Sequence, residues 1–333
     1  MNIFITGIAG FLGSHLADAF LAEGHNVKGC DNLLGGYIDN IPTGAKFYQA
    51  DCRNLSMMKD IMYDTDVVYH CAAAPYEGLS VFSPTQITDI IVTGTTAVLT
   101  AAITNKVKRF VYCSSMSRYG TNKVPFTEDM DPNPQDPYAI AKVTGEQMTK
   151  LLCELNGLQY VIAVPHNIIG PRQKYDDPFR NVASIMLNLM LQGRQPIIYG
   201  DGSQRRCFSY VADDLKVLKA IATEAMIHGQ IFNIGPDEEF VSMNELAQLI
   251  AAEIGMELHP EYYPDRPQEV KLANCSADKI RKWFNYQTEW TLQAGLREMI
   301  KYIKQRGTKP FSYHLEIEIS NEKTPVTWKE RKF

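Results

Sequence analysis

The chain has 333 residues, 45% hydrophobic and 21% charged, which is ordinary for a globular protein with one large or two moderate domains. Its net charge of −5 gives no electrostatic reason to expect nucleic acid or an anionic membrane as the main partner. The first six residues lack the basic region of a signal peptide, and Ile90–Asn105 is Thr-rich and too short to span a bilayer comfortably.

The cysteines and histidines give no sign of a metal site or of disulfide bonds. The histidines show no H-E-x-x-H grouping, and no cysteines are paired at the spacing of a zinc site. The cysteines are odd in number and scattered, so we expect reduced thiols, a cytoplasmic protein and no bound metal. They are Cys30, Cys52, Cys71, Cys113, Cys153, Cys207 and Cys275.

The first part of the chain alternates strand-like and helix-like stretches. Residues 2–6 form an apolar, β-branched run that predicts a buried strand, residues 14–21 have a helical pattern, and residues 26–30 predict a second strand that ends in Asp31. The alternation continues with predicted strands at 47–50, 66–71, 109–113, 160–164 and 232–235, and with predicted helices at 55–62, 85–105 and 137–155. This order favours a parallel sheet covered on both faces, in the doubly wound α/β class.

A glycine-rich turn joins the first strand to the first helix. Gly7, Gly10 and Gly13 follow the spacing G-x-x-G-x-x-G, which allows a tight reversal and the approach of a pyrophosphate to backbone N–H groups. Asp31, about twenty residues further on, would accept hydrogen bonds from a ribose 2′-hydroxyl and repel a 2′-phosphate. This Rossmann pattern predicts NAD, rather than NADP, as the cofactor.

Two polar groups are placed to act beside such a cofactor. Ser114 and Ser115 end a predicted strand, so their hydroxyls should face the ligand crevice. Tyr138 and Lys142 lie four residues apart on a predicted helix, and therefore on one face of it. A nearby lysine and a positive nicotinamide ring would lower the pKa of the phenol and let Tyr138 act as a base. A second Y-x-x-x-K, at residues 119–123, falls in a Gly/Asn loop where this spacing does not bring the side chains together.

These motifs, in this order, resemble the extended short-chain dehydrogenase/reductases of the nucleotide-sugar epimerase and dehydratase family, of the UDP-glucose 4-epimerase type. The resemblance covers nearly the whole chain. It is carried by 6-TGxxGxxG-13, 31-DN-32, 51-DC-52, 70-HCAA-73, 114-SS-115, 138-YxxxK-142, 167-NIIGPR-172, 200-GDGxQxR-206 and 266-RP-267.

The resemblance implies a role for each matching residue. The NAD-binding residues would be Gly7, Gly10, Phe11, Leu12, Gly13, Asp31, Asn32, Asp51, Cys52, Ala72, Ala73, Tyr138 and Lys142. The catalytic residues would be Ser115, Tyr138 and Lys142, with Tyr138 as the acid/base. The residues that bind a nucleoside-diphosphate sugar would be Ser115, Asn167, Arg206 and Arg266, with the two arginines on the diphosphate, as suits bidentate guanidinium groups.

The alternation of strands and helices loosens past Pro165, and together with the resemblance this predicts the domain organisation. Residues 1–165 would form the NAD-binding Rossmann domain, with later sheet strands from about 208–240. Residues 166–333 would mainly form a smaller, interwoven nucleotide-sugar lobe and a C-terminal tail, which we expect along the surface or against a partner subunit. Helices 85–105 and 137–155 would pair with their copies in a homodimer.

Some positions depart from the family pattern. In 4,6-dehydratases the catalytic Ser/Thr is followed by an Asp-Glu pair, whereas Met116 and Ser117 stand here and neither can eliminate water. The loop at residues 75–78 also differs from the usual epimerase loop. Its Glu77, and His166, are polar side chains expected near the sugar, with an orienting or structural role.

The sequence therefore predicts an enzyme that oxidises C4 of a nucleoside-diphosphate sugar. Tyr138 would take the C4 hydroxyl proton as hydride passes to NAD, and a 4-epimerase would return the hydride to the opposite face. Two alternatives stay open: a 4-dehydrogenase that releases the 4-keto sugar, and a non-catalytic regulatory protein that binds NAD or a nucleotide sugar.

Overall fold

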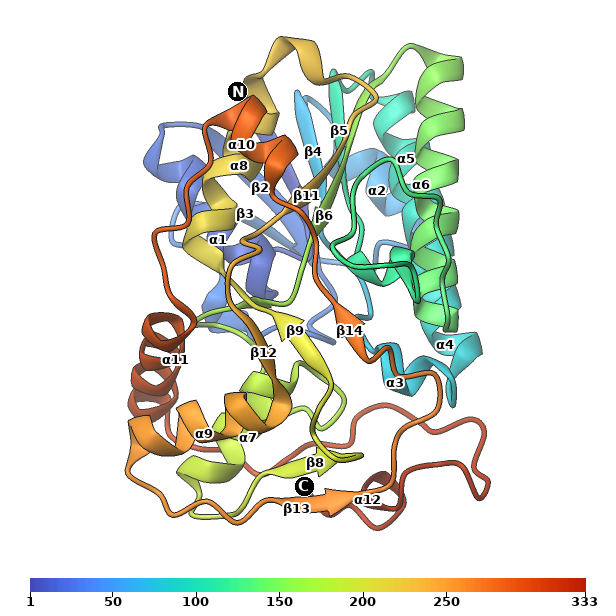
Figure 1. Ribbon diagram of the computed structural model, residues 1–333. Coiled ribbons are helices and arrows are strands. Elements are labelled where there is room, and N and C mark those ends of the chain that lie inside the picture. The colour runs from blue at the N-terminus through green and yellow to red at the C-terminus, as the bar shows by residue number, and fades with distance from the viewer.

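The computed structural model describes residues 1–333 and is built on a seven-stranded parallel sheet in the order β11-β6-β5-β4-β1-β2-β3 (Figure 1). The chain starts in the middle of the sheet, runs outward to β3, and then returns to β4 and runs outward the other way. This is the predicted doubly wound α/β fold. The strands are β1 (Asn2–Thr6), β2 (Asn26–Asp31), β3 (Lys46–Gln49), β4 (Val67–His70), β5 (Arg109–Cys113), β6 (Gln159–Pro165) and β11 (Ile231–Ile234).

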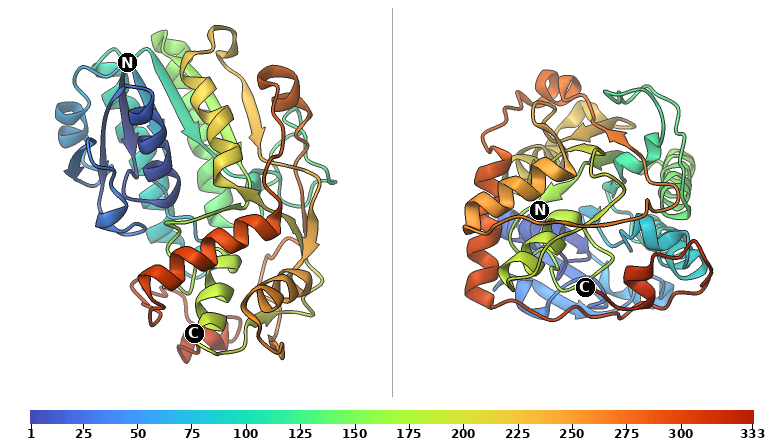
Figure 2. Two further views of the ribbon diagram at one scale, coloured as in Figure 1. Left: turned by 90° about the vertical axis from the view of Figure 1, so that its left-hand side faces the viewer. Right: turned by 60° about the horizontal axis from the view of Figure 1, so that its bottom comes forward.

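Both faces of the sheet are buried, because alternate side chains of each strand enter separate hydrophobic cores. Phe4 and Phe110 belong to the core under α2 (Leu55–Ile61), α5 (Gly94–Thr104) and α6 (Pro137–Asn156). Ile3, Ile5 and Val111 belong to the opposite core, under α1 (Phe11–Ala22), α8 (Val211–Thr223) and α10 (Asp278–Phe284). Figure 2 shows this layering of helices on the sheet.

The helix predicted over 85–105 is confirmed as one continuous helix, Pro84–Thr104, which contains an irregular stretch. After α3 (Glu77–Ser80) the chain forms α4 (Pro84–Thr88), a π-helical segment, η2 (Asp89–Thr93), and then α5. The β-branched run in η2 weakens the regular helix, and the Thr93 hydroxyl donates to the Asp89 carboxylate at 2.7 Å. The run Pro84–Thr104 is long and apolar enough to cross a membrane, but half of its most apolar window is buried inside the protein, where it packs on α2 and α6.

A smaller lobe lies at the carboxyl-terminal edge of the sheet (lower half of Figure 1). Its core joins α7 (Val182–Leu191), α9 (Met243–Ile254) and α11 (Leu292–Arg306). The chain passes between this lobe and the large sheet several times, since α8, β11 and α10 pack in the sheet layers. The small strands are β7 (Ile168–Ile169), β8 (Ile197–Tyr199), β9 (Arg205–Cys207), β10 (Ser209–Tyr210), β12 (Phe240–Ser242), β13 (Glu261–Tyr263) and β14 (Leu272–Ala273).

The C-terminal tail, residues 308–333, runs along the surface and ties the lobe to the helices beside the sheet. The Glu318 carboxylate accepts hydrogen bonds from the backbone N–H groups of Thr85 and Gln86, both at 2.9 Å, at the start of α4. Trp328, in α12 (Val326–Lys329), is 2% exposed and packs edge-to-face against Phe82 and Phe179. The tail is therefore part of the folded structure and bridges the two lobes.

Replacing Trp328 by alanine should destabilise the protein by about 3–5 kcal/mol, because it removes a buried indole from an aromatic cluster. The free energy of unfolding, measured by urea denaturation, checks this. Trp283→Ala is the control, since Trp283 is 37% exposed and should cost clearly less. Equal losses in the two variants would contradict the structural role assigned to the tail.

Candidate active site

The residues that the sequence singles out gather along the carboxyl-terminal edge of the large sheet. The glycine turn follows β1, Asp31 ends β2, Ala72 and Ala73 follow β4, and Ser115 follows β5. The strand order reverses between β1 and β4, which is where open parallel sheets leave a ligand crevice.

The glycine turn is shaped to receive a phosphate group. Gly7 has a φ of +72°, and a Cβ placed on it would lie 3.0 Å from the backbone nitrogen of Ala72. Helix α1 begins after Gly10 with no side-chain cap and with no acidic residue in its first turn. Its first N–H groups are therefore left for a ligand, as a bound pyrophosphate requires, so the turn fits NAD.

Asp31 holds the glycine turn to the end of β2. Its two carboxylate oxygens accept hydrogen bonds from the backbone N–H groups of Ala9, at 3.0 Å, and Leu33, at 2.7 Å. Burial raises the pKa of Asp31, and these N–H groups oppose the shift. Each oxygen keeps a further lone pair, so the carboxylate can still accept the ribose hydroxyl expected of it.

The predicted adenosine-side residues are linked to one another. The Asn32 amide donates to the Asp51 carboxylate at 3.0 Å, and Arg53 forms an ion pair with the same carboxylate at 2.8 Å. The Arg53 guanidinium holds the pKa of Asp51 down, at about 2. The Cys52 sulfur lies 3.9 Å from that of Cys30, and neither cysteine forms a disulfide.

Ser115 and Tyr138 meet at the end of β5. The Ser115 hydroxyl accepts hydrogen bonds from the backbone N–H and the hydroxyl of Ser117, at 3.2 and 2.9 Å, which leaves its own proton free to donate. Ser114, at the same strand end, also lines the crevice, as predicted. Its hydroxyl donates to buried Glu146, which pairs with Arg118, because this carboxylate needs polar partners inside the core.

Tyr138 and Lys142 lie on the buried face of α6. The Lys142 ammonium donates to the Cys113 carbonyl at 2.6 Å and lies 4.9 Å from the centre of the Tyr112 ring. Burial lowers the pKa of Lys142 to about 8. Burial and the nearby Glu77 raise the pKa of Tyr138 above its ordinary value, while a hydrogen bond from Ser115 lowers it. Ser115, through this bond, and Arg180, through its charge, are therefore the protein groups that favour the Tyr138 phenolate.

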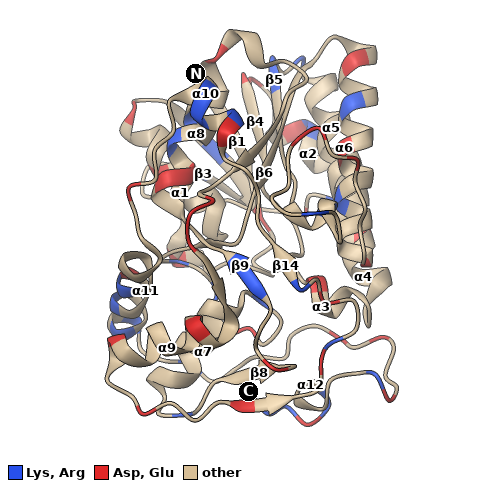
Figure 3. Ribbon diagram, viewed as in Figure 1, with Lys and Arg blue, Asp and Glu red and all other residues tan.

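A cavity of about 330 Å³ runs from this pair into the small lobe. It is lined by Ser115, Tyr138, Asn167, Arg206 and Arg266, so the structure brings together five residues that the sequence assigned to one site. Figure 3 shows the basic strand β9, which carries Arg206, at the junction of the two lobes and beside β14.

The two arginines are held in place by other parts of the chain. Arg206 donates to the carbonyls of Val270, at 2.6 Å, and Arg205, at 2.9 Å. Arg266 forms two hydrogen bonds with Glu269, at 3.1 and 2.9 Å, and stacks 4.7 Å from the centre of the Tyr199 ring. These partners fix both guanidinium groups in the cavity wall.

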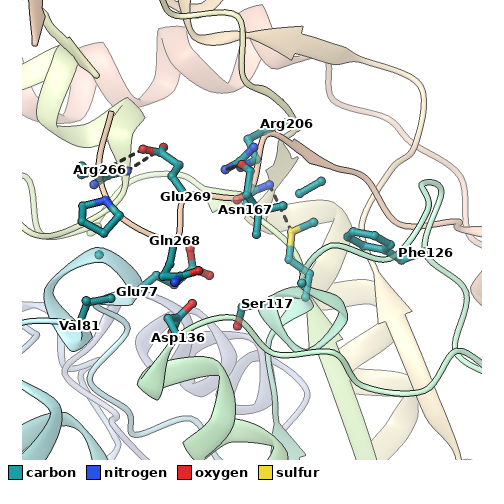
Figure 4. A pocket seen from close by; sticks show the side chains of 16 residues that line it. Glu77, Val81, Ser117, Phe126, Asp136, Asn167, Arg206, Arg266, Gln268 and Glu269 are labelled. Atoms are coloured by element: carbon teal, nitrogen blue, oxygen red, sulfur yellow. Dashed lines mark hydrogen bonds and ion pairs between the residues drawn. The ribbon is translucent and has the colours of Figure 1, made fainter. Parts of the chain in front are cut away.

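Two carboxylates lie opposite these arginines (Figure 4). Glu77 lines the cavity, and Asp136 lines an adjoining pocket that shares Glu77, Arg206 and Arg266 with it. Glu77 begins α3, and Asp136 caps α6 by accepting a hydrogen bond from the backbone N–H of Ala139 at 2.9 Å. Enclosure in the cavity and the charge of Asp136 raise the pKa of Glu77 to about 7, and Arg206 and Arg266 oppose this shift.

The remaining sequence-predicted residues have structural surroundings. His166 is fully buried and bonds the Pro236 carbonyl at 2.8 Å, so it lies outside the cavity wall. The second Y-x-x-x-K is separated as expected, since Tyr119 is buried against Phe126 and Lys123 is exposed. Met116 and Ser117 line the cavity, so no acid/base pair stands at the dehydratase positions.

Sequence reasoning missed part of the cavity wall. Tyr199, Arg180 and Phe333 also line it, from β8, from the loop before α7 and from the end of the tail. The aromatic side chains in an otherwise charged tail were the only sequence signal for Phe333, and contacts so far apart along the chain leave no local pattern.

A glycine turn at a helix start, an acidic strand end and a Ser-Tyr pair on the crevice, with Lys142 buried one helical turn from Tyr138, are typical of a dinucleotide-dependent enzyme. The model of the NAD dependent epimerase/dehydratase family matches residues 3–235, and the chain belongs to this family. It is accordingly an enzyme with NAD as its cofactor, in agreement with the sequence prediction.

Relatives and solved structures are similar over almost their whole length. A putative UDP-glucose 4-epimerase of Methanocaldococcus jannaschii is 35% identical over 311 residues, covering 92% of this chain and 99% of the relative. The UDP-glucose 4-epimerase of Thermotoga maritima, solved with UDP-glucose, has a TM-score of 0.86 at 30% identity and covers 92% of this chain and 99% of its own. UDP-glucuronic acid 4-epimerase of Bacillus cereus, solved with UDP-glucuronic acid and NAD, has a TM-score of 0.86 at 28% identity and covers 92% and 100%.

Gly7→Ala should weaken NAD binding about tenfold or more, because the added Cβ presses on Ala72 and shifts the turn. Titration of the protein with NAD, followed by calorimetry, measures this. Gly24→Ala is the matched control: Gly24 has a φ of +77° but no heavy atom within 4 Å of the added Cβ. Both variants carry the same backbone strain, so a similar loss of NAD affinity in both would contradict the site.

Proposed function

We propose that this enzyme is a 4-epimerase of UDP-hexoses. The observation that carries the proposal is that the Ser115–Tyr138 pair and the Arg206–Arg266 pair line one cavity at the carboxyl-terminal edge of the NAD-binding sheet. A sugar with its C4 at the first pair and its C1 diphosphate at the second spans this cavity. The similarity to UDP-glucose 4-epimerases supports both the reaction and the uridine nucleotide.

The proposed NAD-binding residues are those that the family resemblance implies, and their positions at the strand ends support them. The turn containing Gly7, Gly10, Phe11, Leu12 and Gly13 would hold the pyrophosphate, while Asp31 and Asn32 would hold the adenosine ribose. Asp51 and Cys52 would lie beside the adenine, and Ala72 and Ala73 would line the rest of the cofactor. When bound, NAD supplies the acceptor and donor of hydride at the sugar carbon.

Tyr138 is the proposed acid/base. Its phenol would take the proton of the C4 hydroxyl and later return it to the inverted C4 oxygen. Ser115, with its own proton free, would donate to the same sugar oxygen and to the phenolate. Lys142, anchored to the Cys113 carbonyl, would bind the nicotinamide ribose and bring a positive charge close to Tyr138.

Asn167, Arg206 and Arg266 are the proposed substrate-binding side chains. Asn167 lies in the wall between the two pairs, where its amide donates to the Cys207 carbonyl at 2.9 Å. Arginine is suited to a diphosphate because its planar group donates to two oxygens at once. Met116 and Ser117 provide no group for water elimination, which disfavours a 4,6-dehydratase.

The test is to incubate the enzyme with NAD and UDP-glucose or GDP-sugars, and to follow NADH absorbance and product stereochemistry. We expect a C4-inverted UDP-sugar without net NADH. A keto product with reduced cofactor would instead identify a 4-dehydrogenase. Turnover of none of the sugars would favour a regulatory protein that binds NAD or a nucleotide sugar.

Tyr138→Phe should lower kcat by about 10²–10⁴-fold, because it removes the acid/base hydroxyl and keeps the ring. Dinucleotide binding should persist, as measured by calorimetry. Tyr119→Phe is the matched control from the second Y-x-x-x-K; it loses a hydrogen bond to Asn233 and should keep its turnover. Full activity in the Tyr138 variant would remove the proposed mechanism.

We also propose the domain division, the homodimer and the cytoplasmic location that the sequence predicts. Residues 1–165, with later sheet strands from about 208–240, would bind NAD, and 166–333 would mainly hold the nucleotide sugar. A homodimer through α5 and α6 is supported by large apolar side chains exposed on one face of α6, where Ile140 is 53% and Leu151 62% exposed. Seven free cysteines accord with a cytoplasmic protein.

Charged substitutions on this face should break the dimer. The double variant Ile140→Glu, Leu151→Glu should have the mass of one chain, 37.6 kDa, in light scattering, and the unsubstituted protein twice that mass. Met226→Glu, at a residue that is 77% exposed on another surface, is the control and should remain dimeric. An unchanged mass in the double variant would argue against this interface.

A further inference from the structure

We infer that Glu77 and Asp136 form an acidic wall that restricts the substrate to hexoses without a carboxylate at C6. This inference rests on the function proposed above and names its substrate class. The B. cereus relative was solved with a UDP-uronic acid, so uronates are compatible with this fold and the side chains around the sugar must decide.

The first observation is that the Glu77 carboxylate has no partner in the protein. It lines the cavity, and none of the hydrogen bonds or ion pairs in the structure involves its carboxylate oxygens; only its backbone carbonyl is used, by Ser80. Figure 4 shows the side chain directed into the cavity beside Asp136. The Glu77 carboxylate is therefore available to a ligand.

The second observation is that the nearby cations are already engaged. Arg266 is paired with Glu269, and Arg206 is bonded to backbone carbonyls, while Asp136 bonds Ala139 and Ser80. Two further cations line the cavity and are also engaged: Arg180 with Asp177 and the Gly35 carbonyl, and Lys174 with Asp176. If a diphosphate occupies Arg206 and Arg266, no unpaired cation is left to balance a further negative charge beside Glu77. The sugar end of the cavity would then repel a uronate.

The third observation is the position of Glu77 along the proposed substrate. Glu77 lines the cavity together with Tyr138, where C4 would lie, and with Arg206 and Arg266, where the diphosphate would lie. Glu77 therefore flanks the hexose between these points. Inversion at C4 requires the keto sugar to present first one face and then the other to NAD. Turning the ring about the line from C1 to C4 does this, and it also exchanges the two edges of the ring, one of which carries C6. A group in the side wall meets the C6 edge in one of the two orientations.

The Glu77 carboxylate distinguishes sugars with a C6 hydroxymethyl group from sugars with a C6 carboxylate. A C6 hydroxymethyl group can donate a hydrogen bond to the Glu77 carboxylate, whereas a C6 carboxylate cannot donate and is repelled. The Glu77 carboxyl, with its pKa raised to about 7, loses its charge as the pH falls. The groups that face it are Asp136, Tyr138, Arg206, Arg266 and Glu269.

The experiment uses the NAD-loaded enzyme and measures the affinities of UDP, UDP-glucose and UDP-glucuronate by calorimetry, together with kcat/KM for the two sugars. We expect UDP-glucuronate to bind about tenfold or more weakly than UDP-glucose at pH 8, as like charges in a cleft repel. In Glu77→Gln this difference should shrink to about threefold or less, as expected when one charge is removed. Glu257→Gln, whose side chain is 86% exposed, is the matched control and should keep the difference.

The pH dependence of the sugar preference, measured on the unsubstituted enzyme, is a second test. The preference for glucose should decrease between pH 8 and pH 6, as Glu77 takes up a proton, and Glu77→Gln should show no such change. If UDP fails to bind, the proposed function itself is wrong. If UDP binds but glucuronate binds as well as glucose, or the Glu77→Gln variant keeps the full preference, the acidic wall is wrong.

Discussion

The architecture depends on a parallel sheet whose strands are buried on both faces. Helices must cover such a sheet, and connections that start at its centre and wind outward in both directions leave one uncovered place, between the ends of β1 and β4. Backbone N–H groups in the first turn of α1 have no side-chain cap there, while those of the turn from Gly7 to Gly10 bond within the protein and fix its shape. The other binding residues are arranged around this opening because they follow neighbouring strands.

Hydrogen bonding prepares the site before any ligand arrives. Asp31 fixes the glycine turn through Ala9, and Lys142 is anchored to the end of β5. The two arginines are oriented by Glu269 and by backbone carbonyls. Holding charged groups in place in this way reduces the reorganisation required during the reaction. Glu77 is the exception, since its carboxylate has no partner in the protein and is left for a ligand.

The cavity is closed by parts of the chain that are far apart in sequence. β8, β9 and the segment around Arg266 come from the small lobe, while Phe333 comes from the end of the tail. The tail is held by the aromatic packing of Trp328 and by the bonds of Glu318 to α4. Binding of a nucleotide sugar and packing of the two lobes are therefore linked through the same contacts.

The sequence by itself determined the sheet, the glycine turn and the alternation of strands and helices, because these depend on local periodicity and backbone preferences. It also identified Tyr138 and Lys142 on one helical face, since four residues make about one turn. Only the tertiary structure decided that the Ser114 hydroxyl is bound by Glu146 while the Ser115 proton stays free, and that Glu77 lies beside Asp136. These outcomes depend on residues that approach from distant segments, and a local pattern carries no information about such contacts.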